Sequence, residues 1–120
     1  GYVLMPEHVH LLLSEPRHLP LDGTLRVLKA ETSKKLKGDR PHFWQTRYYD
    51  FNVFTQDKFV EKIDYMHRNP VERGLAAQPE DWQWSSALHW LTGKQGTVEI
   101  ESHWTWNRRE RAAGTQAQPE

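Results

Sequence analysis

The spacing of apolar and polar residues along the chain predicts two strands and three helices. An apolar run predicts a strand over Tyr2–Leu13, and a run rich in β-branched and aromatic residues predicts another over Phe43–Phe54. Leucines at roughly helical spacing predict a helix over Asp22–Leu36. A second helix is expected over Thr55–Asn69. We expect it to end there because the next residue is a proline, which disfavours helical geometry in the residue before it. A short turn followed by a third helix is expected within Pro79–Leu91.

The last part of the chain shows no comparable pattern. Periodicity fades after Gly93, and the residues from Arg108 to Glu120 are mostly small, polar or charged. We therefore predict one domain over residues 1–100, followed by a tail over residues 101–120 that is partly disordered. A domain of this size is long enough for a single hydrophobic core.

Composition limits the chemistry that the protein can perform. Sixteen lysines and arginines balance sixteen aspartates and glutamates, so any attraction for phosphate groups must be local. The chain has no cysteine, which excludes disulfides and thiolate metal sites. No apolar run approaches the length of a transmembrane helix, and no charged-then-apolar leader opens the chain, so we expect a cytoplasmic protein.

Two histidines separated by one residue lie within the first apolar run, MPEHVHLLL. In an extended segment alternate side chains share a face, so His8 and His10 are expected to point to the same side. Two imidazoles placed in this way are able to bind one divalent cation, provided that another part of the chain supplies a further ligand. The alternative is a buried histidine that only hydrogen-bonds a backbone carbonyl.

The second predicted helix carries polar side chains that are suited to complete such a site. Its face toward the core is an apolar stripe of Phe59, Ile63 and Met66. Tyr65 lies well away from this stripe, and Asn69, four residues further on, shares the face of Tyr65. With the two histidines, these side chains would form a three-ligand metal site beside a hydroxyl nucleophile. Taken separately, Tyr65 is also explained as a half-exposed surface residue and Asn69 as a helix C-cap, while His67 is interpreted as structural.

Three blocks of the sequence, taken in order, are similar to those of one protein family. MPEHVHLLL, then YMHRNPVERGL, then PEDWQWSSA resemble the REP-associated tyrosine transposases, which belong to the HUH single-strand DNA endonucleases with one catalytic tyrosine. The HUH name describes a histidine, a bulky apolar residue and a histidine, as in His8-Val9-His10. The resemblance covers roughly Tyr2 to Ile100.

The resemblance implies a role for each motif residue and a fold. Tyr65 would be the nucleophile, and His8, His10 and Asn69 would bind a divalent metal ion, Mg²⁺ or Mn²⁺. The implied reaction cleaves and rejoins single-stranded DNA through a 5′-phosphotyrosine intermediate and needs no ATP. The implied fold is α+β and ferredoxin-like, an antiparallel sheet flanked by helices.

The partner implied by the resemblance is single-stranded DNA beside a palindromic hairpin. We expect a monomer or a homodimer to bind it, and we expect no membrane partner. Cationic side chains and an aromatic ring are candidates for contacts to phosphates and unpaired bases. These candidates are Lys34, Lys35, Arg47, Tyr48, Arg68 and Arg73. Each of them is also explained as an ordinary surface residue.

The chain departs from the family pattern at its start. The family normally has a further strand and helix before the strand that carries the histidines, whereas this chain opens within the apolar run. We therefore expect a fold that lacks its first strand and helix and exposes an edge of its sheet. Two other functions stay open, an inactive remnant that only binds hairpin DNA and a dimerisation module that uses the exposed edge.

Overall fold

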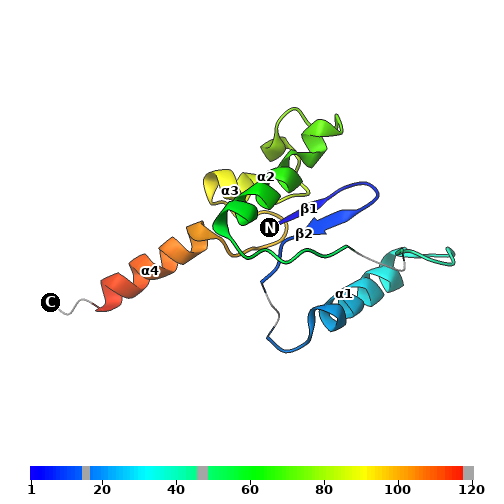
Figure 1. The fold of residues 1–120 in the computed structure, drawn as a ribbon, viewed down its shortest axis with the longest axis horizontal. Coiled ribbons are helices and arrows are strands. Elements are labelled where there is room, and N and C mark those ends of the chain that lie inside the picture. Colours follow the sequence, from blue (N-terminus) through cyan, green and yellow to red (C-terminus); the bar gives the residue numbers. More distant parts are fainter. Residues whose placement is uncertain (15–16, 46–48, 118–120) are drawn as a thin grey trace. The chain divides into compact units, whose positions relative to one another are not determined.

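The computed structural model describes residues 1–14, 17–45 and 49–117, and the side chains as far as residue 113. The chain forms two compact units, one built from Gly1–Leu12 and Phe54–Glu120 and the other from Leu13–Val53. The described residues form a small antiparallel sheet of two strands and four α-helices, which is an α+β composition (Figure 1). None of these helices is long and apolar enough to cross a membrane.

The first unit opens with a β-hairpin. Strands β1 (Tyr2–Leu4) and β2 (Val9–Leu11) pair antiparallel, with Val3 opposite His10 (Figure 1). The register places the side chain of Val3 in the core, where it is completely buried.

The prediction of one continuous strand over Tyr2–Leu13 is wrong. The chain reverses direction at Pro6 and Glu7, and the Met5 N–H donates to the His8 carbonyl (2.8 Å) at the base of the turn. Proline at this position has its φ already fixed near the value that the first corner of a turn requires. The reversal places Glu7 at the corner of the turn, next to His8.

The segment before the third helix covers the outer edge of β1. The Leu4 N–H donates to the Trp84 carbonyl (2.7 Å), and the Ser86 N–H donates to the Tyr2 carbonyl (3.0 Å). An isolated antiparallel bridge also joins this segment to the middle of β1. This edge of the hairpin, on β1, therefore finds backbone partners within the same unit, while the expected exposed edge stays a prediction for the rest of the sheet.

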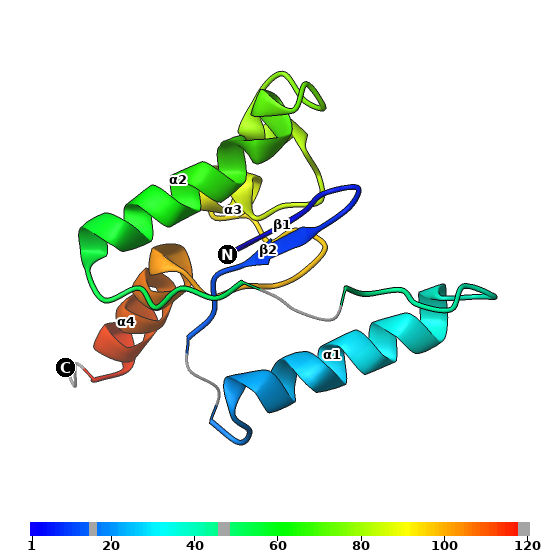
Figure 2. The same ribbon diagram turned by 45° about the vertical axis from the view of Figure 1, so that its right-hand side comes forward.

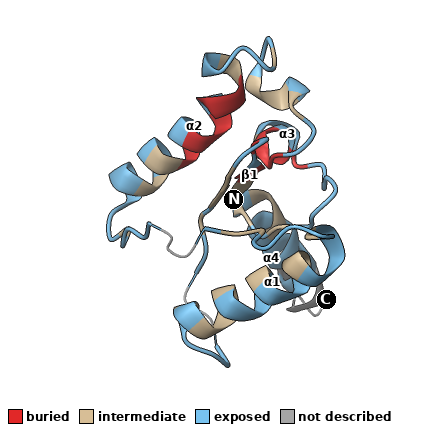
Figure 3. Cartoon of the chain, turned by 90° about the vertical axis from the view of Figure 1, so that its right-hand side faces the viewer, coloured by how far each residue is buried: buried red, intermediate tan, exposed pale blue. Residues whose placement is uncertain are grey.

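Helix α2 (Gln56–Glu72) begins where the sequence predicts. Thr55 is its N-cap, and the threonine hydroxyl accepts a hydrogen bond from the Lys58 N–H (3.1 Å). The hairpin lies beside this helix (Figure 2). Burial is concentrated in the second half of α2 and in α3 (Figure 3). The buried apolar residues of the unit are Val3, Met5, Ile63, Met66 and Ala87.

The predicted end of α2 at Asn69 is wrong, because the helix continues through Pro70, which is fully buried. The end is instead set by Gly74, whose φ of 74° is favourable for glycine. The Gly74 N–H donates to the Val71 carbonyl (3.0 Å), and the Leu75 N–H donates to the Pro70 carbonyl (2.8 Å). These two bonds form a Schellman motif, which supplies hydrogen-bond donors to the Pro70 and Val71 carbonyls at the end of the helix.

The predicted turn and third helix are confirmed. A short 3₁₀ helix, η1 (Pro79–Asp81), precedes α3 (Ala87–Thr92). Gly93 follows α3 with a φ of 81°, and its N–H donates to the His89 carbonyl (2.7 Å). Glycine is the residue that most easily adopts this left-handed conformation at the end of a helix.

Helix α4 spans His103–Ala117, within the tail over residues 101–120 that we expect to be partly disordered, and that expectation stays a prediction. The start of α4 is fixed by polar contacts with the end of α3. The Trp104 indole N–H donates to the Trp90 carbonyl (3.0 Å), and an Arg108 N–H donates to the Gly93 carbonyl (2.6 Å). These contacts connect side chains of α4 to backbone carbonyls at the end of α3, so no periodic apolar pattern in the sequence indicates them.

The second unit contains α1 (Leu21–Leu36), which confirms the predicted helix although none of its residues is buried. The predicted strand over Phe43–Phe54 is wrong for residues 43–45 and 49–54, and residues 46–48 lie outside the described part of the chain. A strand needs a paired neighbour to satisfy its backbone groups. Here Trp44 instead donates its indole N–H to the Lys29 carbonyl of α1 (3.0 Å).

A buried serine connects β1, α2 and the start of α3. Ser86 Oγ accepts a hydrogen bond from the Tyr2 N–H (2.9 Å) and lies 2.8 Å from His67 Nε2 and 3.2 Å from the Tyr2 carbonyl oxygen. His67 and Ser86 are both buried. The position of His67 agrees with its interpretation as a structural residue.

We expect Ser86→Ala to lower the free energy of unfolding by about 2 kcal/mol, because it leaves buried polar groups without a partner. Denaturant unfolding measures the change. Gln83→Ala, an exposed substitution in the same segment, is the control and should stay within about 0.5 kcal/mol of the wild type. A Ser86→Ala variant as stable as this control would contradict the role of the serine.

The buried histidine predicts a pH dependence of stability. Burial lowers the pKa of His67 to about 4 from an ordinary value of 6.5. Between these values the unfolded state binds more protons, so stability is greatest above pH 6.5 and falls as the pH drops toward 4. From about pH 7.5 to about pH 5, this histidine should account for a loss of about 2 kcal/mol.

Denaturant unfolding of the wild type and His67→Gln at both pH values tests this expectation. The difference in stability between the two proteins should shrink at the lower pH. His42→Gln, which changes an exposed histidine, should keep the pH dependence of the wild type. If His67→Gln also keeps it, the histidine is not the group responsible.

Candidate functional site

The hairpin and α2 bring the predicted site residues together. His10 lies on β2, and His8 immediately precedes that strand. Tyr65 and Asn69 lie four residues apart on α2 and therefore on one helical face, as the sequence predicts. Fifty-nine positions separate His10 from Asn69 in the sequence, yet their side chains are in contact.

Three polar groups converge at the centre of this site. The two imidazoles meet edge to face, with His8 Nε2 at 3.1 Å from His10 Nε2. His10 Nε2 lies 3.3 Å from Asn69 Nδ2. A half-turn of the carboxamide exchanges its nitrogen and oxygen, so Asn69 can present Oδ1 at the same place.

These separations suit three ligands of one small divalent cation. Ligand atoms about 2.1 Å from a shared ion lie about 3.0 Å apart in octahedral geometry and about 3.4 Å apart in tetrahedral geometry. The two measured separations, 3.1 Å and 3.3 Å, fall within this interval. No group of three His, Cys, Asp or Glu side chains in the described residues is arranged to hold a metal ion, so a three-ligand site here depends on Asn69.

Protonation also favours metal binding at His10. Burial, with a smaller contribution from the neighbouring His8, lowers the pKa of the His10 imidazole. A histidine binds a metal ion only through an unprotonated nitrogen. His10 is therefore in its neutral form at physiological pH, with no proton to displace from a charged ring.

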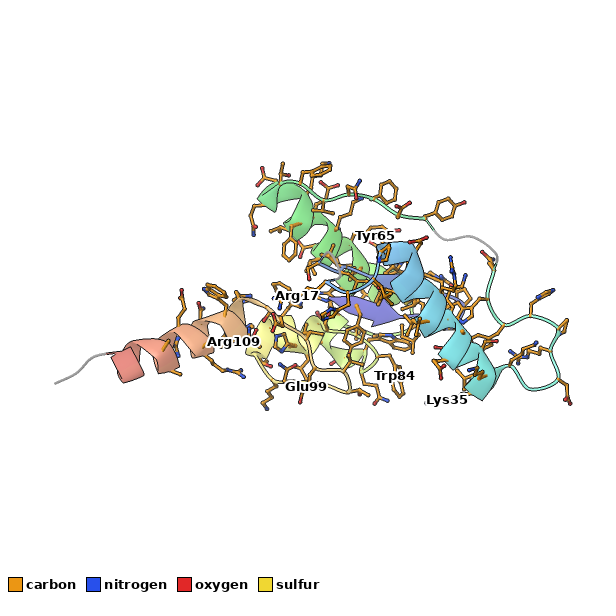
Figure 4. The ribbon with its side chains drawn as sticks, turned by 90° about the horizontal axis from the view of Figure 1, so that it is seen from below. Arg17, Lys35, Tyr65, Trp84, Glu99 and Arg109 are labelled. Atoms are coloured by element: carbon orange, nitrogen blue, oxygen red, sulfur yellow. The ribbon has the colours of Figure 1, made fainter. Side chains whose placement is uncertain are left out.

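Tyr65 lies at the open side of the site. Its ring centroid is 5.9 Å from that of His10, and 50% of the residue is exposed to solvent. Figure 4 labels this side chain. An exposed phenol beside a group of metal-ligand side chains is accessible to a large substrate, which a buried phenol would not be.

Glu7 is the residue of this site that the sequence reasoning missed. Its Oε1 accepts hydrogen bonds from His8 Nδ1 (2.9 Å) and from Arg73 Nη1 (2.5 Å). The hydrogen bond from Arg73, followed by the charge of the same group, lowers the pKa of the Glu7 carboxyl, which is therefore ionised. Its position next to His8 in the sequence was an available signal, but the reversal of the chain at Pro6 was needed to interpret it.

The two arginines predicted to bind DNA both belong to the end of α2. Arg68 lies 3.9 Å from the carboxylate of Glu72 and donates from Nε to the Asp64 carbonyl (3.3 Å). Arg73 pairs with Glu7, as described above. Both arginine side chains are at least half exposed, so these ion pairs leave surface on each guanidinium.

The other predicted DNA contacts belong to the second unit. Lys34 and Lys35 lie in the last turn of α1, and Lys34 is 3.4 Å from the carboxylate of Glu31. Figure 4 labels Lys35 on this helix. Arg47 and Tyr48 lie outside the described residues. A role in DNA binding stays a prediction for all four.

Compared with models of known protein families, with curated proteins and with solved structures, the chain gives no match.

The geometry predicts a specific response to loss of one imidazole. The His10→Ala variant should show no Mn²⁺ binding at concentrations that saturate the wild type, because it removes the central ligand of the three. Calorimetric titration with Mn²⁺ measures this binding directly. His42→Ala removes an exposed histidine of the second unit and should bind as the wild type does. Equal binding by His10→Ala and His42→Ala would contradict the site.

Proposed function

We propose that the protein is an HUH-type, metal-dependent endonuclease and transposase that cleaves and rejoins single-stranded DNA, with Tyr65 as its nucleophile. The observation that carries the proposal is the convergence of His8, His10 and Asn69 beside an exposed Tyr65. The resemblance of the three sequence blocks to the REP-associated tyrosine transposases supports the same reaction. We extend the proposal to the HUH type of ferredoxin-like fold and to a cytoplasmic location.

The reaction begins at the phenol oxygen of Tyr65. This oxygen gives its proton to solvent and attacks the phosphorus of a DNA phosphodiester, so an O–P bond to tyrosine forms while the bond from phosphorus to the 3′ oxygen breaks and that oxygen takes up a proton from solvent. A phenol has an ordinary pKa of about 10, so the attack needs a strongly polarised phosphate. Bound Mg²⁺ or Mn²⁺ would supply that polarisation as a Lewis acid.

The same residues allow the reverse reaction. Cleavage leaves a 5′-phosphotyrosine and a free 3′-hydroxyl, and the number of phosphoester bonds is unchanged. A 3′-hydroxyl from the same or another strand attacks the phosphotyrosine, rejoins the DNA and releases Tyr65. The exchange needs no ATP, because the bond to tyrosine takes the place of the broken phosphodiester bond.

We propose single-stranded DNA beside a palindromic hairpin as the substrate. The half-exposed Tyr65 requires a substrate that approaches from solvent, and Arg68 lies on the adjacent turn of the same helix. Exposed cations at such a place attract phosphate groups locally, which a chain without net charge needs.

A denaturing gel tests the proposed reaction. A labelled single-stranded hairpin oligonucleotide, incubated with the protein and Mn²⁺, should yield a covalent protein–DNA adduct that chelation of the metal prevents. Tyr65→Phe removes the attacking oxygen and should reduce the adduct by at least about 10³-fold. Tyr49→Phe is the matched control, because Tyr49 is 97% exposed, and it should leave the adduct unchanged.

Two results would count against the proposal. An undiminished adduct with Tyr65→Phe would show that another group is the nucleophile. The lack of any adduct, combined with a retained shift of the oligonucleotide on a native gel, would favour a protein that only binds hairpin DNA.

A further inference from the structure

We propose that Glu7 and Arg73 are positioning residues, which hold His8 in the orientation and the tautomer that metal binding requires. The inference rests on the metal site of the proposed function and extends it to two residues that are not among the proposed metal ligands. Three contacts carry the inference, and all of them lie within the first unit of the chain.

The first contact fixes the tautomer of His8. A carboxylate only accepts hydrogen bonds, so His8 Nδ1, 2.9 Å from Glu7 Oε1, must carry a proton. In a neutral ring the lone pair then lies on Nε2, which is the nitrogen that faces His10. In the neutral ring, Glu7 thus selects the tautomer whose Nε2 lone pair points toward the other ligands.

The second contact fixes Glu7 itself. Arg73 Nη1 donates to the same oxygen, Oε1, that accepts from His8. Without this guanidinium, an exposed glutamate at the corner of a turn would be free to adopt other rotamers. Arg73 therefore acts on His8 through the carboxylate.

The third contact connects the pair to another ligand. Arg73 is the C-cap of α2, and its backbone N–H donates to the carbonyl of Asn69 (3.0 Å). One residue thus contacts the turn of helix that presents Asn69 and, through Glu7, the imidazole of His8. We infer that this chain of contacts sets the distance between ligands from the hairpin and from the helix before a metal ion arrives.

The ion pair between Glu7 and Arg73 contributes little to the stability of the fold. The side chains of Glu7 and Arg73 are 51% and 50% exposed, and ion pairs at such positions add little to stability. A role in positioning and a role in folding therefore predict different results. Substitution should weaken metal binding while the midpoint of thermal unfolding stays close to that of the wild type.

Calorimetric titration with Mn²⁺ separates these roles. We expect Glu7→Ala and Arg73→Met to weaken Mn²⁺ binding about 10-fold or more, as is usual when a partner of a metal-binding histidine is lost. Glu7→Gln keeps an acceptor for His8 Nδ1 and should recover part of the affinity. Lys58→Met is the matched control, because it removes an exposed cation from the same helix and should bind as the wild type does.

A second readout observes His8 directly, without metal or DNA. Nitrogen-15 spectra of the metal-free protein at about pH 8, above the ordinary histidine pKa, should show a proton on Nδ1 of His8. In Glu7→Ala, this preference should be lost. Neither a general loss of stability nor a change in DNA binding would move the proton from one ring nitrogen to the other.

The outcomes distinguish this inference from the proposed function. Glu7→Ala with the Mn²⁺ affinity of Lys58→Met, or with an unchanged tautomer of His8, would overturn the inference even if DNA cleavage is observed. A wild type that binds no Mn²⁺ would overturn it as well. Weakened Mn²⁺ binding in Glu7→Ala would support the inference even if the gel shows no adduct on Tyr65.

Discussion

The packing of the β-hairpin against α2 is the contact on which both the fold and the site depend. Val3 and Met5 from the hairpin form one buried cluster with Met66 from the helix. Full burial of side chains of this size contributes about 1.5–3 kcal/mol each, which is a large share of the stability of a small unit. Because β1 holds β2 in register, the apolar contact of one strand also determines where the other strand presents His10.

The polar groups of the candidate site lie beside this apolar contact between the hairpin and α2. His8 and His10 are half-buried and Tyr65 is half exposed, so these imidazole and phenol groups keep contact with water at a modest cost of desolvation, whereas the Asn69 amide is buried beside them. His67, which points from α2 into the core, is instead neutral and hydrogen-bonded to Ser86. His67 and His10 thus differ in role, because His67 faces the core whereas His10 faces the candidate site beside it.

The sequence alone predicts the parts of this structure that depend on local periodicity and on motif spacing. It predicts α1 and the start of α2, and it selects the four side chains that the structure brings together at the end of the hairpin. The i, i+4 spacing of Tyr65 and Asn69 survives in the fold because helical geometry fixes it. The two histidines also meet, although His8 lies just outside β2.

The errors in prediction arise where distant residues decide the local structure. The apolar run from Tyr2 to Leu13 contains a turn, because Pro6 starts a reversal that the alternation of residues does not reveal. Helix α2 passes Pro70 because Gly74 offers a better-bonded end five residues after Asn69. Helix α4 is held by indole and guanidinium bonds to carbonyls of α3, and such contacts leave no periodic pattern.

The location of bound Mn²⁺ tests the central claim most directly, because the account depends on one ion that is shared by the hairpin and the helix. A crystal structure of the protein with Mn²⁺, using the anomalous signal of the metal, measures this location. The account predicts one ion bonded to Nε2 of both His8 and His10 and to Oδ1 of Asn69, with the Tyr65 hydroxyl on its open side. An ion bound elsewhere, or one that contacts the histidines while Asn69 points away, would contradict the account.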